Sequence, residues 1–321
     1  MNKLYNKEIF PPKGNPDAKG TWGEFYIDAN GEWGEKIIKL DNNCSKVGAK
    51  CEAFIANYIN GIRAKGVTII GVIEYPENPS TFTSDTFYLK MKYGGLSLEK
   101  KYGKLTFKNM VQLLSHILSA LSFLHNNGIF HCDIKDANIV MDLDGCFKLI
   151  DFGLAQFHDS RISSYNHKIR KYSRWWRSPQ MQFNHSQELV NWSKADLWAV
   201  GAVILSQLGF QLNPETIKRY NPDVNWNKLE KDIISQGKDS IHDDLYEYVY
   251  LRPEHVQNVM NAVQETLRTK YADEDRIIMF IELLKGLMEF DASERISIDH
   301  VLSHPLFNAN DDGSPKSVTD I

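Results

Sequence analysis

One short stretch of the chain gathers the polar side chains that phosphoryl transfer needs. Residues 131–153 read HCDIKDANIVMDLDGCFKLIDFG and contain two carboxylates, an ammonium group and an amide, on Asp133, Asp151, Lys135 and Asn138. One carboxylate can orient an acceptor hydroxyl. The amide oxygen and the other carboxylate can hold magnesium, a hard cation that prefers oxygen ligands. The lysine can neutralise charge on a phosphoryl group in transfer.

The elements around these residues bring them to one place. The segments IVM and CFKLI are typical of strands, and the DLDG turn between them predicts a hairpin. The pattern therefore predicts a loop, a hairpin and a second loop, with the four polar side chains at one end of the hairpin. Taken singly, either aspartate could equally be a turn residue.

HCDIKDAN followed by IDFG resembles the catalytic loop and metal-binding loop of eukaryotic protein kinases, whose pattern is H-R-D-x-K-x-x-N and then D-F-G. The resemblance implies that Asp133 is the catalytic base and Lys135 the phosphate-contacting lysine. It also implies that Asn138 and Asp151 hold Mg2+. A lysine two residues after the aspartate is similar to the serine/threonine class of these enzymes.

Further motifs of the same family follow in order. Lys39 ends EKIIK, which resembles the V-A-I-K strand whose lysine holds the α- and β-phosphates of ATP. Glu52 is the candidate for the helix-borne glutamate that pairs with it, at a separation of 52 − 39 = 13 residues. AKGTWGEF at 18–25 resembles the glycine-rich loop, and MKYG at 91–94 resembles the segment that meets adenine.

The resemblance thus implies a set of ATP-binding residues in the first hundred positions. Main-chain groups of Lys92 and of Gly94 or Tyr93 would meet the adenine, and Met91 would be the gatekeeper beside it. The predicted cofactor-binding residues are Ala18, Gly20, Gly23, Phe25, Ile37, Lys39, Met91, Lys92, Tyr93 and Gly94.

Three later motifs extend the resemblance over about residues 17–307. SRWWRSPQ at 173–180 is similar to the end of an activation segment, and ADLWAVG at 195–201 to the start of the D-x-W-x-x-G helix. ERISIDHVLSHPLF at 294–307 is similar to the closing arginine helix. The Arg177-Ser178-Pro179 stretch most resembles the group of cyclin-dependent and MAP kinases, some of which favour proline after the acceptor.

The chain departs from the family beside its catalytic base. Cys132 replaces the arginine that normally meets a phosphate on the activation loop. We therefore expect activity that does not depend on activation-loop phosphorylation. The candidate phosphate acceptors that would then not be obligatory are Ser160, Ser163, Ser164 and Tyr165.

Other departures concern the nucleotide pocket and a structural pair. Ala18 replaces the first glycine of the loop, while Phe25 and Ile37 stand where valine and alanine are usual, over the adenine. Gln180 replaces a glutamate that usually pairs with the arginine matched here by Arg295, and a Gln–Arg hydrogen bond can take its place.

The distribution of strand-like and helical patterns predicts a small β-rich part with one main helix, followed by a large helical part. Together with the resemblance, this implies an α+β, bilobal protein kinase fold with a small β-rich N-lobe and a large helical C-lobe. Strand-like runs occupy Gly23–Ile27, Glu35–Leu40, Thr68–Glu74 and Thr86–Tyr93, and a helical period covers Cys51–Arg63. From residue 97 the pattern is mostly helical, with helices expected over Met110–His125, Ser193–Leu208 and Ile277–Phe290. We expect tails at 1–16 and 308–321, an N-lobe at 17–93 and a C-lobe at 94–307.

Composition narrows the remaining classes of protein. Net charge is −4 with a pI near 6.2, so we expect no nucleic-acid partner for the chain as a whole. No apolar run reaches the roughly 18 residues of a membrane helix, and the first residues lack the apolar stretch of a secretory signal. Four cysteines without metal-ligand spacing favour reduced thiols. We therefore expect an intracellular protein, in cytoplasm or nucleus.

The expected partner is a protein substrate. Residues 152–177 carry six basic side chains, Arg161, Lys168, Arg170, Lys171, Arg174 and Arg177, against one acid, Asp159. They form either a solvated basic loop or a docking surface for acidic or already phosphorylated substrates. The regulatory partner is not identified by any motif.

Three functions stay open at this point. The first is a serine/threonine protein kinase that uses ATP and Mg2+. The second is a pseudokinase scaffold, which the substitutions at Ala18, Phe25, Ile37, Cys132 and Gln180 favour. The third is a small-molecule phosphotransferase, which would not be expected to carry SRWWRSPQ and ADLWAVG.

Overall fold

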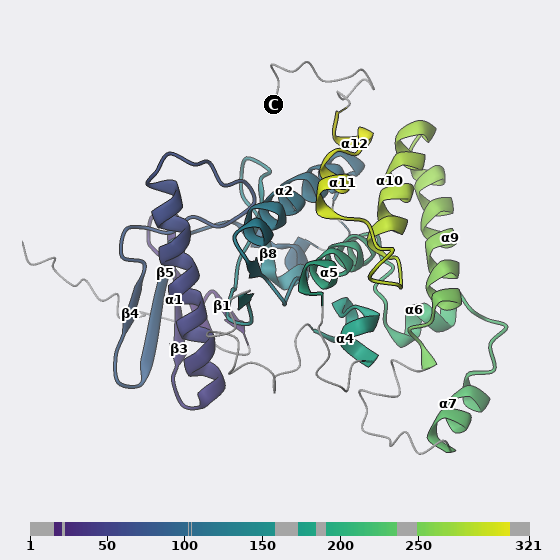
Figure 1. Ribbon diagram of the computed structural model, residues 1–321, viewed down its shortest axis with the longest axis horizontal. Helices are drawn as coiled ribbons and strands as arrows, with labels where there is room; N and C mark the ends of the chain where they lie inside the picture. The colour runs from purple at the N-terminus through teal and green to yellow at the C-terminus, as the bar shows by residue number, and fades with distance from the viewer. Residues whose placement is uncertain are drawn as a thin grey trace, which may run out of the picture. The chain divides into compact units, whose positions relative to one another are not determined.

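The computed structural model describes residues 16–20, 23–101, 103, 105–157, 173–183, 191–235 and 249–308 of the 321-residue chain. The chain forms two compact units, whose elements are labelled in Figure 1. Unit 1 contains the residues up to Val67 together with Ile73–Tyr93. Unit 2 contains Thr68–Val72 and the chain from Gly94 onward. The passage from unit 1 to unit 2 between Tyr93 and Gly94 falls where the two predicted lobes join.

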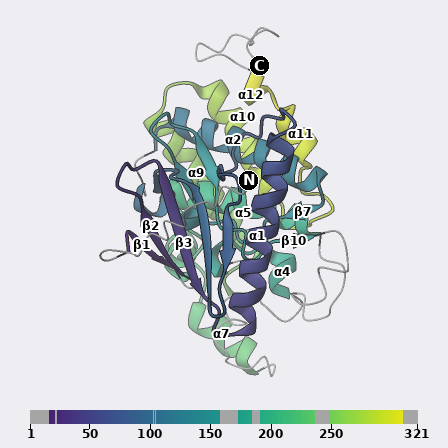
Figure 2. The same ribbon diagram turned by 90° about the vertical axis from the view of Figure 1, so that its left-hand side faces the viewer.

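Unit 1 is a five-stranded antiparallel sheet with one long helix. The strand order is β1-β2-β3-β5-β4. The strands are β1 (Ala18–Gly20), β2 (Gly23–Ile27), β3 (Trp33–Lys39), β4 (Ser80–Phe82) and β5 (Thr86–Lys92). Helix α1 (Asn43–Arg63) lies against this sheet, as Figure 2 shows. Three of the predicted strands are confirmed in β2, β3 and β5.

Helix α1 begins eight residues before the predicted start at Cys51, with Asn43 as its first residue. A capping box fixes this start: the Asn42 side chain accepts from the Ser45 N–H at 2.8 Å, and the Ser45 hydroxyl accepts from the Asn42 N–H at 3.4 Å. The first two turns read NCSKVGAK, which lacks an apolar stripe. Capping, rather than hydrophobic periodicity, therefore sets the beginning of α1.

The predicted strand Thr68–Glu74 is wrong. Its residues form a turn with one isolated parallel bridge between Val72 and Leu149. Gly71 has φ +72°, and a Cβ built on it would lie 2.1 Å from the His116 carbonyl oxygen. Ile69, Val72 and Ile73 are buried although they form no strand, while Ile70 is exposed. A run of β-branched residues therefore did not reveal the conformation.

Unit 2 is mostly helical. Its helices are α2 (Phe107–Asn126), α4 (Pro179–Phe183), α5 (Trp192–Gln207), α6 (Pro214–Arg219), α7 (Trp226–Ser235), α9 (Pro253–Lys270), α10 (Glu274–Leu287), α11 (Ile298–Leu302) and α12 (Pro305–Asn308). Three short 3-10 helices are η1 (Leu98–Lys101), η2 (Asp136–Asn138) and η3 (Arg174–Trp176). The predicted helices at 110–125, 193–208 and 277–290 are confirmed as α2, α5 and α10, with ends shifted by three residues or fewer.

Helix α5 is the buried centre of unit 2 and packs against α2 and α10 (Figure 1). It is apolar on all sides, as expected for a helix enclosed by others. Gly201 permits the approach of α10's end, because a Cβ there would lie 2.5 Å from Met288 Sδ. A helix held this tightly is a rigid base for the segments that hydrogen-bond to it.

Two small sheets complete unit 2. β6 (Leu96–Ser97), β8 (Ile139–Met141) and β9 (Phe147–Leu149) form one, in the order β6-β8-β9. β7 (Ile129–Phe130) pairs with β10 (Gln156–Phe157) to form the other. The predicted hairpin is confirmed as β8–β9, with Ile139 opposite Leu149. Among the helices of the described residues, none has the length and apolar character needed to cross a membrane.

Candidate active site

The loop between β7 and β8 is anchored to the start of α5. The carboxylate of Asp196, fully buried, accepts from the His131 N–H at 2.9 Å and from the Cys132 N–H at 3.0 Å. It also contacts His125 Nε2 at 2.9 Å. Cys132 adopts φ +60°, a left-handed conformation that a residue with a Cβ rarely takes. The two main-chain bonds to one buried carboxylate hold this conformation and fix the direction of the next residues.

Asp133 is the centre of a compact polar network. Its Oδ2 accepts from Lys135 Nζ at 2.7 Å and from Asn138 Nδ2 at 3.0 Å. The Ser173 hydroxyl donates to Asp133 Oδ1 at 3.2 Å, and Lys135 Nζ also donates to that hydroxyl at 3.2 Å. Asp133 is 5% exposed. The structure thus brings Asp133, Lys135 and Asn138 together as predicted.

His131 does not join this network as a chemical group. It is fully buried, its Nε2 lies 3.1 Å from the Ile150 carbonyl oxygen, and its Nδ1 accepts from the Asp133 N–H at 3.2 Å. Its ring packs against Phe152 with centroids 5.0 Å apart. These contacts give His131 a structural role, which is to hold the loop in place.

The two predicted metal ligands are joined by the β8–β9 hairpin. The Ile150 N–H donates to the Asn138 carbonyl at 3.0 Å, so Asp151 follows the strand end opposite Asn138. Asp151 has φ +64°, a second left-handed residue in this region. Asn138 Nδ2 donates to Asp133, and its amide oxygen therefore remains as the ligand atom for a cation. A carboxylate and an amide oxygen fit the ligand preference of Mg2+.

In unit 1 the glutamate of α1 pairs with a lysine other than the predicted one. Glu52 Oε1 lies 2.5 Å from Lys36 Nζ, and the two side chains are 2% and 13% exposed. The predicted pairing of Glu52 with Lys39 is therefore wrong. Side chains alternate across a strand, so Lys36 and Lys39, three residues apart, point to opposite faces of β3. Lys39 is exposed.

The same alternation changes the residue expected beside the adenine. Gly34, Lys36 and Ile38 share one face of β3, while Ile37 lies on the other. Phe25 is opposite Lys36 in the sheet and so shares its face. A Cβ built on Gly34 would lie 2.0 Å from the tip of the Phe25 ring. The position assigned to Ile37 is thus taken by Gly34, and the Phe25 ring fills the space above it.

The other predicted cofactor-binding residues belong to β1, β2 and β5 or follow β5. Ala18 pairs with Phe25, Gly20 with Gly23, and Met91 with Gly34. A Cβ on Gly23 would lie 2.5 Å from the Ile37 carbonyl oxygen, so packing against β3 already requires glycine there.

Two N–H groups after the gatekeeper are used within unit 1. The Lys92 N–H donates to the Glu74 carbonyl at 2.8 Å, and the Tyr93 N–H donates to the Glu32 carbonyl at 2.7 Å. Of the two residues left open for contact with the adenine, Tyr93 thus lacks an available donor. Gly94 is the remaining choice.

The substitution Gln180 keeps its predicted contact. Arg295 Nη2 donates to Gln180 Oε1 at 2.9 Å, and Gln180 Nε2 donates to the Phe290 carbonyl. Arg295 is 1% exposed, and its guanidinium lies 5.1 Å from the centre of the Trp198 ring. The hydrogen bond that the sequence predicts between Gln180 and Arg295 is confirmed.

Three residues of the site were missed or given no role by the sequence analysis. Lys36 could have been found from the alternation of β3, which places it on the face of the buried Ile38. Asp196 carries no local signal beyond the D-x-W pattern. Ser173 lies 40 residues from Asp133 along the chain, and only folding brings the two together.

The activation-segment predictions fall outside the described residues. They concern Ser160, Ser163, Ser164 and Tyr165, and the basic residues Arg161, Lys168, Arg170 and Lys171. Within residues 173–183, Arg177 and Ser178 are buried.

Comparison with known proteins identifies a family that matches most of the chain. A family model described as the protein kinase domain matches residues 36–307. The match begins at Lys36, so the glycine-rich stretch at 18–25 lies outside it.

Curated relatives agree with this match. Mitogen-activated protein kinase 12 of Homo sapiens is 25% identical over 251 residues, which cover 75% of this chain and 62% of the relative. Mitogen-activated protein kinase p38b of Drosophila melanogaster is 26% identical over 209 residues, covering 63% of this chain and 51% of the relative. Serine/threonine-protein kinase SSN3 of Scheffersomyces stipitis is 28% identical over 214 residues, covering 61% of this chain and 47% of the relative. The chain thus spans about half to three-fifths of the length of these relatives.

Proposed function

The chain belongs to the protein kinase domain family, and from this membership we propose that it transfers the γ-phosphoryl group of Mg-ATP to serine or threonine hydroxyls of proteins. The observation that carries the proposal is the polar network on Asp133, in which Lys135, Asn138 and Ser173 all contact one carboxylate. The serine/threonine kinases among its relatives support the choice of acceptor.

In this proposal Asp133 orients the acceptor hydroxyl and takes up its proton. The bonds from Lys135 and Asn138 hold the carboxylate in one orientation, which lowers the entropic cost of positioning the acceptor. Lys135 then neutralises charge that develops on the transferred phosphoryl group. The Ser173 hydroxyl donates to Oδ1 of Asp133. A substrate hydroxyl that binds this oxygen would therefore have to displace the Ser173 hydroxyl or share the oxygen with it.

Asn138 and Asp151 would hold Mg2+, which would neutralise negative charge on the phosphate oxygens. We assign the phosphate-contacting role on β3 to Lys36 in place of Lys39, because the Glu52 carboxylate fixes the position of its ammonium group. The face shared by Phe25, Gly34 and Met91 would receive the adenine, with the Gly94 N–H as a main-chain donor. Ala18, Gly20 and Gly23 would form the strands around the phosphates.

Independence from activation-loop phosphorylation remains part of the proposal. Cys132 is fully buried and has no positive charge to receive a phosphate. Phosphatase-treated and phosphorylated protein should therefore transfer phosphate at equal rates. A large loss of activity after phosphatase treatment would contradict this.

The test of the function is transfer of labelled phosphate from Mg-ATP to a panel of generic serine and threonine substrates. Asp133→Asn should lower kcat/KM by about 10²- to 10⁴-fold, the range for loss of a positioned base. Asp144→Asn, the same change at an exposed turn residue of the β8–β9 hairpin, is the matched control and should keep full activity. Equal transfer by wild type and Asp133→Asn would refute the assignment of the base.

A second candidate function is a pseudokinase scaffold, and the Phe25 ring over Gly34 is the observation that favours it. If this ring blocks the nucleotide, ATP and Mg2+ will not raise the melting temperature. If the nucleotide binds, a free ATP concentration of 100 times Kd should stabilise the fold by about 2.7 kcal/mol. Absence of both a thermal shift and phosphate transfer would favour the scaffold.

A further inference from the structure

Strand β9 lies at the edge of its small sheet, with β8 on one side only. Main-chain N–H groups alternate in direction along a strand, so every second N–H of β9 points away from β8. Both of these groups are paired. The Leu149 N–H donates to the Gly71 carbonyl at 2.8 Å, and the Phe147 N–H donates to Nδ1 of His116, on α2, at 3.1 Å. An imidazole ring thus takes the place that the carbonyl of a neighbouring strand would have.

The surroundings of this hydrogen bond are closely packed. The Phe147 side chain is fully buried, and its ring centroid lies 6.2 Å from that of His116. On the same helix, the carbonyl oxygen of His116 would lie only 2.1 Å from a Cβ built on Gly71. Helix α2 is therefore in tight contact with the 68–72 turn, and the histidine is held beside the edge of β9.

The bond from Phe147 requires a neutral histidine. A ring nitrogen that accepts a hydrogen bond carries no proton, so the proton of the neutral ring is on Nε2. In the protonated ring both nitrogens are donors, and Nδ1–H would face the Phe147 N–H. Burial lowers the pKa of His116, and the negative charge of Asp142 opposes this effect only in part. The folded chain therefore favours the neutral ring and the intact bond.

The charged groups around the ring are few. Asp142, in the turn of the β8–β9 hairpin, is itself paired with Lys148 at 3.1 Å. The 68–72 turn has no titratable side chain. Other titratable side chains on the hairpin and on α11, which also packs on α2, are Cys146, whose pKa is raised by burial, and the exposed Asp299 and His300. No positive charge other than the paired Lys148 acts on His116 from these elements, so burial is the main cause of its lowered pKa.

The far end of the same hairpin presents the two candidate cation ligands. After β9 the Ile150 N–H donates to the Asn138 carbonyl at 3.0 Å, and Asp151 follows directly. We propose that His116 is a positioning residue, which anchors the β8–β9 hairpin to α2 and keeps Asn138 and Asp151 in their binding arrangement only while its ring is neutral. The inference rests on the proposed function, from which the cation-binding role of these two residues comes. Protonation of His116 thus weakens both the fold and the binding of the nucleotide with Mg2+.

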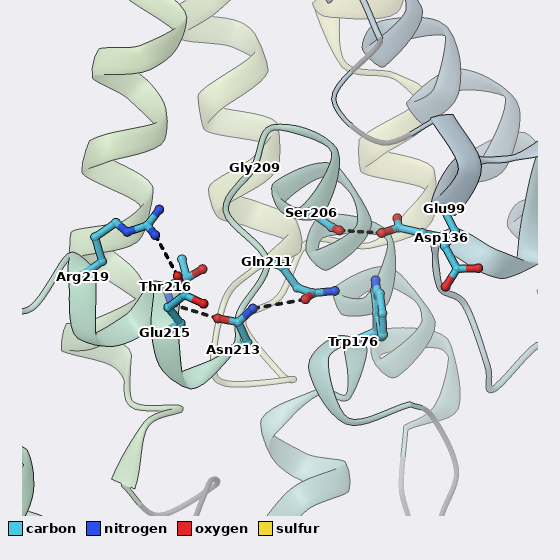
Figure 3. A pocket seen from close by; sticks show the side chains of 10 residues that line it. All are labelled: Glu99, Asp136, Trp176, Ser206, Gly209, Gln211, Asn213, Glu215, Thr216 and Arg219. Atoms are coloured by element: carbon cyan, nitrogen blue, oxygen red, sulfur yellow. Dashed lines mark hydrogen bonds and ion pairs between the residues drawn. The ribbon is translucent and has the colours of Figure 1, made fainter.

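A second buried group titrates in the same range of pH. Asp136 lines a pocket of about 460 Å³ in unit 2 and accepts a hydrogen bond from Ser206 (Figure 3). Burial raises the pKa of Asp136 to about 6. Because this pKa is raised, protonation of Asp136 stabilises the folded state as the pH falls, whereas protonation of His116, with its lowered pKa, destabilises it. The opposite signs allow the two groups to be separated.

The experiment uses the full chain and three readouts between pH 5 and pH 8. Urea denaturation gives the free energy of unfolding without any ligand. Calorimetric titration gives Kd for ADP with Mg2+, which allows no phosphate transfer. The NMR resonance of the His116 ring, identified by its absence in His116→Gln, gives the pKa directly. His116→Gln keeps an acceptor oxygen that does not titrate, Asp136→Asn removes the second buried acid, and His300→Gln is the same change at an exposed histidine.

The His116 resonance should titrate below the ordinary pKa of 6.5. As the pH falls from 7.5 to 5.5, Kd for ADP with Mg2+ should rise about threefold more in wild type than in His116→Gln, because only the wild-type ring loses its acceptor. The same comparison should show a loss of urea stability that His116→Gln lacks. His300→Gln and Asp136→Asn should keep both wild-type differences. If His116→Gln fails to fold, the titration of wild type and the comparison with Asp136→Asn still test the anchor.

A His116 resonance that titrates at or above pH 6.5 would overturn the inference, and so would wild-type pH dependence in His116→Gln. A stability response without any change in the ratio of Kd values would refute the positioning role. Nucleotide binding whose pH dependence does not involve His116 would overturn this inference and leave the proposed function intact. Failure of wild type to bind ADP with Mg2+ at pH 7.5 would count against the proposed function itself, and a stability response specific to His116 would then still support the anchored hairpin.

Discussion

The catalytic loop of unit 2 and strand β3 of unit 1 each place a lysine on a buried carboxylate, yet they differ in how the pair is formed. Lys135 contacts Asp133 two residues away, within one continuous loop. Lys36 contacts Glu52 sixteen residues away, on a helix packed against its strand. The first pair depends on local spacing, and the second depends on which face of the strand meets the helix.

This difference explains why the sequence predicted the first contact but paired Glu52 with the wrong lysine. In the loop, Asp133, Lys135 and Asn138 keep their family spacing, so matching residue types is enough. Strand β3 contains two lysines, Lys36 and Lys39. Because they are three residues apart, choosing one instead of the other moves the side chain to the opposite face of the sheet. Residue type alone does not distinguish the two lysines, whereas alternation and burial do.

The largest expected effect comes from replacing each lysine of β3 in turn by methionine, which tests which of the two contacts the phosphates. Lys36→Met should lower kcat/KM for phosphate transfer by about 100-fold or more, as expected for loss of one positioned donor to the phosphates. Lys39→Met should change it by less than about threefold, because Lys39 is exposed on the other face. Steady-state kinetics with matched melting curves makes the measurement. A greater loss in Lys39→Met would restore the assignment made from the sequence.

A smaller effect tests the face of β3 that carries Gly34. Gly34→Ala places a Cβ where the Phe25 ring lies, so the ring must move, and overpacking of this kind costs about 1–3 kcal/mol in the free energy of unfolding. Phe25→Val should remove the conflict, and the double variant Gly34→Ala/Phe25→Val should regain most of the loss. Chemical denaturation gives the values. Additive effects of the two changes would show that the ring and the glycine do not interact.

The smallest effect is expected for the hydrogen bond between Gln180 and Arg295 in unit 2. Gln180→Ala should cost about 1–2 kcal/mol, because the buried Arg295 loses a hydrogen-bond acceptor. Gln180→Glu should change stability by less than about 1 kcal/mol: a carboxylate strengthens the bond to Arg295 but loses the donor to the Phe290 carbonyl. Gln257→Ala on the exposed side of α9 is the control, and an equal loss there would contradict the role of Arg295.

Much of the fold was predictable because its long helices are strongly apolar, α2 and α10 along one face and α5 on all sides. Helices α2, α5 and α10 were found with small end shifts, and β2, β3 and β5 were found from β-branched and aromatic runs. The failures have local causes. Helix α1 begins at a capping box within a polar stretch, and Thr68–Glu74 has strand composition but turns at Gly71 against the carbonyl of His116.

The sequence by itself determined the order of the motifs and predicted that Asp133, Lys135 and Asn138 lie together, because one short loop holds all three. Tertiary structure decided which residue lies under Phe25 and that Ser173 reaches Asp133, and it showed which of the two lysines of β3 meets Glu52. Contacts of this kind depend on strand face, helix packing and burial, which arise only when distant segments come together.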